Sequence, residues 1–116
     1  MRRRVLKLLE DVRAAADSIQ SYTAGKSESE YLAEKQLRRS VEREFEIIGE
    51  ALRRLDSEYP ASAARITDAR KIIDFRNVLA HGYDAVSDDQ VWVIVTAYLP
   101  SLIADVRSLI EGESRE

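Results

Sequence analysis

Apolar residues recur at helical spacing along nearly the whole chain. The first stretch with this pattern covers about residues 3–22 and carries one apolar stripe, formed by Val5, Leu8, Leu9, Val12, Ala16 and Ile19. Spacings of three and four residues place such positions on a single helix face. Residues 23–27 interrupt the pattern, and they include Gly25, a residue type that often ends helices. The pattern therefore predicts an amphipathic helix that ends before Ser27.

A second, longer helix is predicted from Ser27 or Ser29, either of which can cap its first turn, to about Glu58. Its stripe consists of Leu37, Val41, Phe45, Ile48, Leu52 and Leu55. The helix is predicted to end at Tyr59-Pro60, because a residue before proline avoids helical backbone. Residues 60–66 are then predicted to form a connection.

A third helix is predicted to begin at a cap formed by Thr67 or Asp68 and to end at Gly82. Its stripe contains one charged residue, Arg76, and otherwise consists of Ala69, Ile72, Ile73, Leu79 and Ala80. An arginine at such a position needs an explanation beyond packing, since charged residues are rarely buried unless they are paired.

The fourth helical stretch begins at the capping sequence of residues 87–90. Its apolar stripe consists of Val91, Ile94, Val95, Tyr98, Leu102, Val106 and Leu109. Pro100 falls inside this stripe, so we expect a kink or a split into two helices there. The polar tail, residues 111–116, is expected to fray. The whole pattern predicts an all-α fold, an up-down bundle of four or five helices in one domain, residues 1–116.

Composition narrows the possible chemistry. The 116 residues include no cysteine, which excludes disulfides, thiolate metal sites and a cysteine nucleophile. A net charge of −3 excludes a strongly cationic nucleic-acid scaffold, although a local basic face stays possible. No stretch reaches the ~18–20 apolar residues of a membrane span, and the basic start continues as a charged helix unlike a signal peptide. We expect a cytoplasmic protein that uses no metal or other cofactor.

Candidate chemistry is concentrated in residues 76–83, which read Arg-Asn-Val-Leu-Ala-His-Gly-Tyr and include the only histidine, His81. An imidazole can move the proton of an RNA 2′-hydroxyl or leaving oxygen, and a guanidinium can stabilise the charge on phosphorus. Five helical residues turn by roughly 500°, so Arg76 and His81 point about 140° apart. They can converge only if the last turn distorts or two chains contribute. Asn77, four residues before His81, can hydrogen-bond its ring.

Each of these residues also has a purely structural interpretation. His81 alone could be a surface histidine at a helix end. Arg76 could extend its stem from the bundle or pair with Asp74 or Glu50. Tyr83 could be a packing aromatic, and Asn77 a plain surface residue. The arginine pairs at 38–39 and 53–54 are interpreted as solvated faces, some of which could line an RNA groove.

Residues 76–83 resemble the R-x4-H-x-Y motif of the HepT toxins, members of the HEPN superfamily of helical ribonucleases. The likeness extends from about Leu37 to Leu102, and it includes residues 41–51, residues 70–73, Val91-Trp92 and Leu99-Pro100. One departure is visible. The family often has Pro-Trp ahead of the basic pair before the motif, where this chain has Asp68-Ala69.

The resemblance implies a homodimer whose two motifs form one metal-independent RNA-cleaving site, with Arg76 and His81 as the catalytic pair and Asn77 in support. It also implies a partner, an MNT-type nucleotidyltransferase antitoxin that attaches AMP to the motif tyrosine, here Tyr83. The chain would then be the toxin, an endoribonuclease, of a type VII (HEPN/MNT) toxin–antitoxin system. Two alternatives stay open: a non-catalytic HEPN module that binds a nucleotidyltransferase, and a plain dimeric helical bundle.

Overall fold

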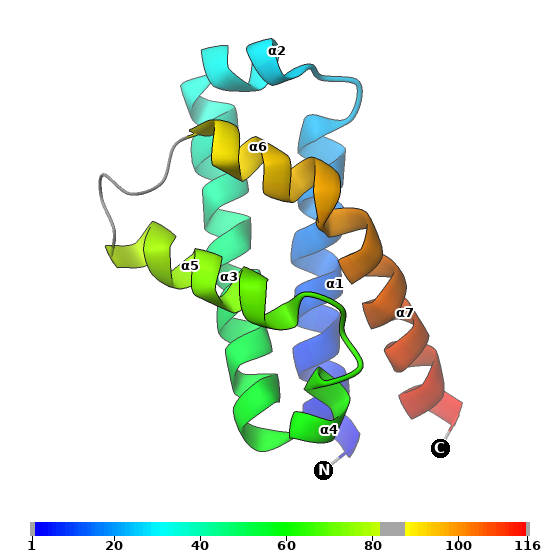
Figure 1. The fold of residues 1–116 in the computed structure, drawn as a ribbon. Helices are drawn as coiled ribbons and strands as arrows, with labels where there is room; N and C mark the ends of the chain where they lie inside the picture. The colour runs from blue at the N-terminus through cyan, green and yellow to red at the C-terminus, as the bar shows by residue number, and fades with distance from the viewer. Residues whose placement is uncertain (1, 82–87, 116) are drawn as a thin grey trace.

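The computed structural model describes the backbone of residues 2–81 and 88–115, and the side chains of residues 3–77 and 88–113. This part of the chain forms seven helices and no strand, which confirms the all-α prediction (Figure 1). The helices are α1 (Arg2–Thr23), α2 (Glu28–Ala33), α3 (Lys35–Glu58), α4 (Pro60–Ala63), α5 (Ala69–His81), α6 (Asp88–Ala97) and α7 (Leu99–Arg115).

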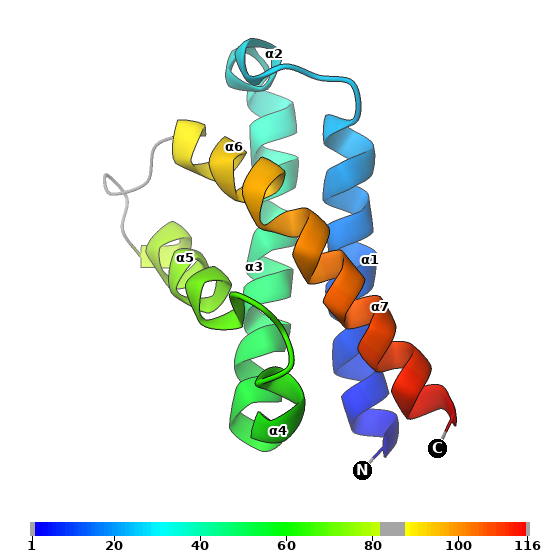
Figure 2. The same cartoon turned by 45° about the vertical axis from the view of Figure 1, so that its right-hand side comes forward.

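The long helices α1 and α3 run antiparallel and form the frame of the molecule (Figures 1 and 2). Helix α5 packs on α3, and α7 packs on α1. The core between them consists mostly of apolar side chains, and its large fully buried members include Leu9, Ile19, Phe45, Ile48, Leu52, Ile72 and Leu102. All of these belong to the stripes that the sequence predicts, because helical spacing alone decides which positions face inward.

The first turn in the chain agrees with the prediction. Gly25 has φ 72, a left-handed backbone that glycine adopts at no steric cost. Ser27 then caps α2 through a capping box: its side chain accepts from the N–H of Glu30, and the Glu30 carboxylate accepts from the N–H of Ser27.

The prediction of one unbroken helix from Ser27 to Glu58 is wrong. The chain leaves helical geometry at Glu34, where φ is −109 and ψ is 99, so α2 and α3 are separate helices. The break turns α2 toward α6, and the fully buried ring of Tyr31 packs against Trp92 with 5.3 Å between ring centroids. This contact joins residues 61 positions apart, so periodicity within either segment does not reveal it.

Two smaller differences concern the connection after α3 and the C-terminus. Residues 60–63 form a single helical turn, α4, in which Pro60 occupies the first position, where its missing N–H costs nothing. The polar tail, expected to fray, continues α7 as far as Arg115. The split near Pro100 is confirmed, since α6 and α7 are separate helices bent by 46°.

Helix α5 is fixed at its start by α7. The N–H of Thr67 donates to the Asp105 carboxylate at 2.8 Å. Asp68 occupies the predicted cap position, with φ 62, and its carbonyl accepts from the N–H of Ile72. Among the described residues, no single helix is long and apolar enough to cross a membrane, and the bent pair α6–α7 reaches that length and composition only when both are joined.

Candidate functional site

Arg76 lies where α5 crosses α3. Ile72 and Ile73, one turn earlier, are buried against the core, and Arg76 follows them on the same stripe. Its side chain is 26% exposed, so the stem is packed between helices while the guanidinium reaches the surface. The predicted stripe position of Arg76 is therefore what places its charged group at the α3–α5 crossing.

Gly49 allows the two helices to approach at this point. A Cβ atom at Gly49 would lie 2.2 Å from the Cβ and 2.4 Å from the Cγ of Arg76. These atoms belong to the fixed stem of the arginine, so they cannot move aside as the end of a flexible side chain would. Glycine in a helix interior costs roughly 0.5–1 kcal/mol relative to alanine, and here the close approach explains its presence.

Glu50, the next residue on α3, contacts the guanidinium of Arg76. Its Oε2 lies 3.6 Å from Nη2 of Arg76. The same carboxylate accepts from Nη2 of Arg53 at 2.8 Å and from Nε of Arg54 at 3.0 Å. The hydrogen bonds from Arg53 and Arg54 and the charges of Arg53 and Arg76 outweigh partial burial and lower the pKa of Glu50 to about 2. Glu50 is therefore ionised throughout the physiological pH range.

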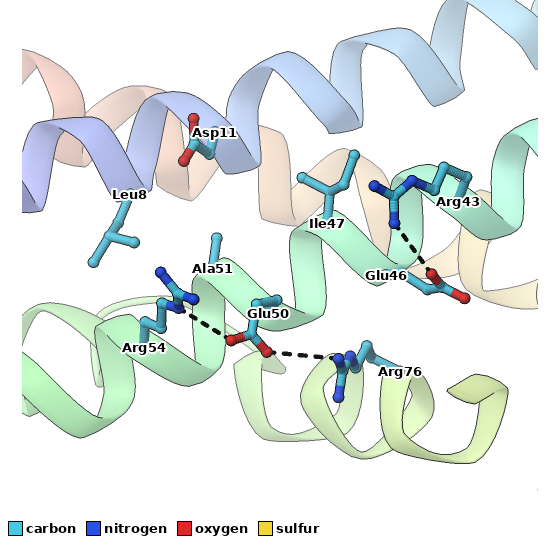
Figure 3. A pocket seen from close by; sticks show the side chains of 9 residues that line it. All are labelled: Leu8, Asp11, Arg43, Glu46, Ile47, Glu50, Ala51, Arg54 and Arg76. Carbon is cyan, nitrogen blue, oxygen red and sulfur yellow. Dashed lines mark hydrogen bonds and ion pairs between the residues drawn. The ribbon is translucent and has the colours of Figure 1, made fainter. Parts of the chain in front are cut away.

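A cleft of about 310 Å³ opens beside this ion pair, between α1, α3 and α5 (Figure 3). Its lining is Leu8, Asp11, Arg43, Glu46, Ile47, Glu50, Ala51, Arg54 and Arg76. Three of these residues are basic and three are acidic, and Arg43 is paired with Glu46 at 3.4 Å. Because the charges balance, the cleft of one chain is not by itself a strongly attractive surface for RNA phosphates.

The other predicted site residues are only partly described. Asn77 is exposed, and its Oδ1 accepts from Nη1 of Arg76 at 3.3 Å. The expected bond between Asn77 and His81 depends on the His81 side chain, which lies outside the described side chains, as Tyr83 lies outside the described residues altogether. The backbone of α5 is helical through His81. Positions 76 and 81 are therefore about 140° apart around one helix axis, with no unwound turn between them.

From the sequence, Glu50 is one of two possible partners of Arg76 and Arg54 belongs to a pair that could line an RNA groove, whereas Gly49 and Arg43 do not stand out. Two signals were present. Gly49 stands in the middle of a long helix, where glycine is unfavourable, and Glu50 is followed by arginines at the i+3 and i+4 positions. Neither signal identifies Arg76 as the third partner. Within the described part of the chain, no three histidine or acidic side chains form a group that could hold a metal ion.

Comparisons with known proteins match most of the length of the chain. A family model described as "Ribonuclease HepT-like" matches residues 12–109. A protein of Methanocaldococcus jannaschii named "Putative RNase" is 27% identical over 105 residues, 90% of this chain and 95% of that protein. "Probable ribonuclease HepT" of Thermococcus cleftensis is 29% identical over 102 residues, 88% of this chain and 92% of that protein.

A longer relative, also from Methanocaldococcus jannaschii, is named "Gamma-glutamylcyclotransferase and putative RNase". It is 28% identical over 111 residues, which are 96% of this chain, and the chain spans about half of its length. No solved structure matches the chain significantly.

Proposed function

Because the chain belongs to the HepT-like ribonuclease family, we propose that it is an endoribonuclease whose catalytic residues are Arg76 and His81. The observation that carries the proposal is the placement of Arg76. Its guanidinium contacts Glu50 of α3. Arg76 itself lies on α5, the helix that also carries the only histidine of the chain, His81. The family match includes this whole segment.

The proposed reaction needs no metal. The 2′-hydroxyl of RNA loses its proton to a base and attacks the adjacent phosphorus, the 5′-oxygen leaves with a proton from an acid, and a 2′,3′-cyclic phosphate remains. His81 would transfer these protons, and Arg76 would stabilise the negative charge that grows on the phosphoryl oxygens. Asn77 supports this role, because its Oδ1 contacts the guanidinium of Arg76.

The proposed site is shared by two chains. One histidine per chain supplies either an acid or a base at a given moment, and positions 76 and 81 face different directions around α5. A two-fold homodimer would bring each motif to its own copy, because such an interface uses the same patch on both subunits. Each chain would then contribute its own Arg76 and its own His81 to the shared site.

The test is RNA cleavage by the purified wild-type chain, Arg76→Ala and His81→Ala, each with and without EDTA. Each substitution is expected to lower the rate by about 10²–10⁴, because each removes a group that acts on the transition state. Arg70→Ala is the matched control, since Arg70 lies on the same helix and pairs with Asp56 away from the cleft. Loss of wild-type cleavage in EDTA and its return with Mg²⁺ would refute the metal-free mechanism. A wild-type chain without cleavage that still binds a nucleotidyltransferase would favour the non-catalytic module.

We also propose that the chain is the toxin of a type VII (HEPN/MNT) toxin–antitoxin system in the cytoplasm, controlled by an MNT-type nucleotidyltransferase that attaches AMP to Tyr83. AMP would add a phosphate and a purine beside the RNA-binding residues, and both its bulk and its charge would oppose RNA binding. After incubation with the partner, ATP and Mg²⁺, intact-mass spectrometry should show added AMP on the wild-type chain and none on Tyr83→Phe. AMP found on another residue would contradict the assignment.

A further inference from the structure

We propose that Glu50 is the positioning residue for Arg76, and that Gly49 provides the space in which the arginine stem lies. The proposal rests on the proposed function, because it assigns the role of Glu50 through the catalytic role of Arg76. Gly49 and Glu50 are adjacent on α3 and together contact the whole length of the arginine: the glycine faces its Cβ and Cγ, and the carboxylate faces its guanidinium.

The guanidinium is oriented from two sides. Oε2 of Glu50 lies 3.6 Å from Nη2, and Oδ1 of Asn77 accepts from Nη1 at 3.3 Å. The buried Nε of Arg76 has no hydrogen-bond partner among the described residues. The direction of the guanidinium is therefore set by the packing of the arginine stem against Gly49 and by the contacts of its terminal nitrogens with Glu50 and Asn77. Of the two, only Glu50 carries a charge, so it supplies the stronger attraction.

Glu50 orients Arg76 without cancelling its charge. Its shortest hydrogen bonds go to Arg53 and Arg54, at 2.8 and 3.0 Å, and the contact with Arg76 is longer. One carboxylate thus contacts three guanidinium groups, and two of them, those of Arg54 and Arg76, line the cleft (Figure 3). An RNA phosphate could take over the guanidinium of Arg76 while Glu50 stays paired with the two other arginines.

The central experiment is a double-mutant cycle with Glu50→Gln and Arg76→Ala. Glu50→Gln keeps the side-chain shape and removes the charge, so kcat should fall about tenfold with KM nearly unchanged, because misorientation affects the transition state more than RNA binding. In the Arg76→Ala background, measured at high protein concentration, Glu50→Gln should change the rate less than twofold. Glu42→Gln is the matched control, since Glu42 lies on the same helix and pairs with Arg39 outside the cleft.

A second variant tests the packing of the Arg76 stem against Gly49. Gly49→Ala places a methyl group against the Cβ and Cγ of Arg76, and these atoms can yield only if the arginine or α5 shifts. Its cleavage should fall at least as far as that of Glu50→Gln, with helicity by circular dichroism unchanged. Should Gly49→Ala not fold, Glu50→Gln carries the test alone.

A readout that does not depend on cleavage separates this proposal from the proposed function. The Nε–H signal of Arg76 in ¹⁵N NMR, assigned by its loss in Arg76→Ala, should be shifted from the bulk arginine signals in the wild type and return toward them in Glu50→Gln. If the wild type does not cleave RNA but this change occurs, the function fails and the positioning role stands. The positioning role is overturned if the signal does not change, or if Glu50→Gln lowers the activity of Arg76→Ala as much as that of the wild type.

Discussion

Glu50 is ionised in the folded chain because Arg53, Arg54 and Arg76 surround its carboxylate. In the unfolded chain these partners are lost and the pKa returns from about 2 to its ordinary value of 4.5. A carboxyl group with a lowered folded-state pKa stabilises the fold above its unfolded pKa, and that stability is lost as the pH falls toward the folded pKa. The relevant window is therefore pH 4.5 down to about 2.

Comparison of the wild type with Glu50→Gln should isolate the contribution of the ionised Glu50 carboxylate to the free energy of unfolding. Above pH 5 the wild type should have the larger free energy of unfolding, by about 1–2 kcal/mol once solvent screening of a partly exposed network is allowed for. The difference should shrink steadily as the pH is lowered through 4 toward 3. Urea unfolding followed by circular dichroism at pH 7, 5, 4 and 3 measures it. A difference that is the same at pH 7 and pH 3 would contradict the assigned pKa.

At this same scale, the sequence singles out Arg76 as a candidate, names Glu50 only as one of two possible partners, and does not point to Gly49. Arg76 is conspicuous because it interrupts an apolar stripe and begins the R-x4-H-x-Y pattern. Gly49 and Glu50 lie on another helix, and their importance depends on how α3 and α5 cross. Helical periodicity shows which face of each helix is buried, but it does not give the register of one helix against another.

At the scale of the helices, the stripes predict the ends of α1 and α3 and the split near Pro100, because each has a local cause in a glycine or a proline. The break at Glu34 has no such cause. It coincides with the burial of Tyr31 against Trp92. A tertiary contact of this kind overrides local propensity, which is a weak guide when it acts alone.

Helix α5 contains both core residues and the residues of the proposed site. Its first half is buried through Ile72 and Ile73, and its start is fixed to α7 by the bond from Thr67 to Asp105. Its second half carries Arg76 and ends at His81. A helix that is fixed at one end keeps the side chains at its other end well oriented. The proposed site needs this, because Arg76 must hold its guanidinium in one direction.

At the scale of the whole molecule, the helical path between positions 76 and 81 explains why two chains are expected at one site. Because α5 continues without an unwound turn, one chain does not bring both positions to the same side. The proposed site would therefore depend on a dimer, which the sequence predicts from the angle between positions 76 and 81, from one histidine per chain and from the family resemblance. A site shared by two chains can be tested by combining two inactive variants in one dimer.

We predict that a mixed dimer of Arg76→Ala and His81→Ala chains cleaves RNA although both parent homodimers are nearly inactive. The mixed dimer retains one arginine and one histidine, on different chains. If the two chains contribute to one site, its rate should exceed that of either homodimer by about 10-fold or more, since each homodimer lacks a group worth 10²–10⁴ in rate. Co-expression with two different affinity tags, tandem purification and a cleavage assay measure this directly.

The control is a doubly tagged dimer in which both chains carry Arg76→Ala, prepared in the same way, since it reports any wild-type or contaminating ribonuclease. Light scattering on each sample establishes the number of chains at the assay concentration. Because exchange of subunits would regenerate only the two inactive homodimers, it can lower the expected signal but cannot create one. A purified mixed dimer no more active than this control would mean that Arg76 and His81 must come from the same chain or that the site needs both histidines. A monomeric wild type that cleaves RNA at full rate would remove the need for a shared site.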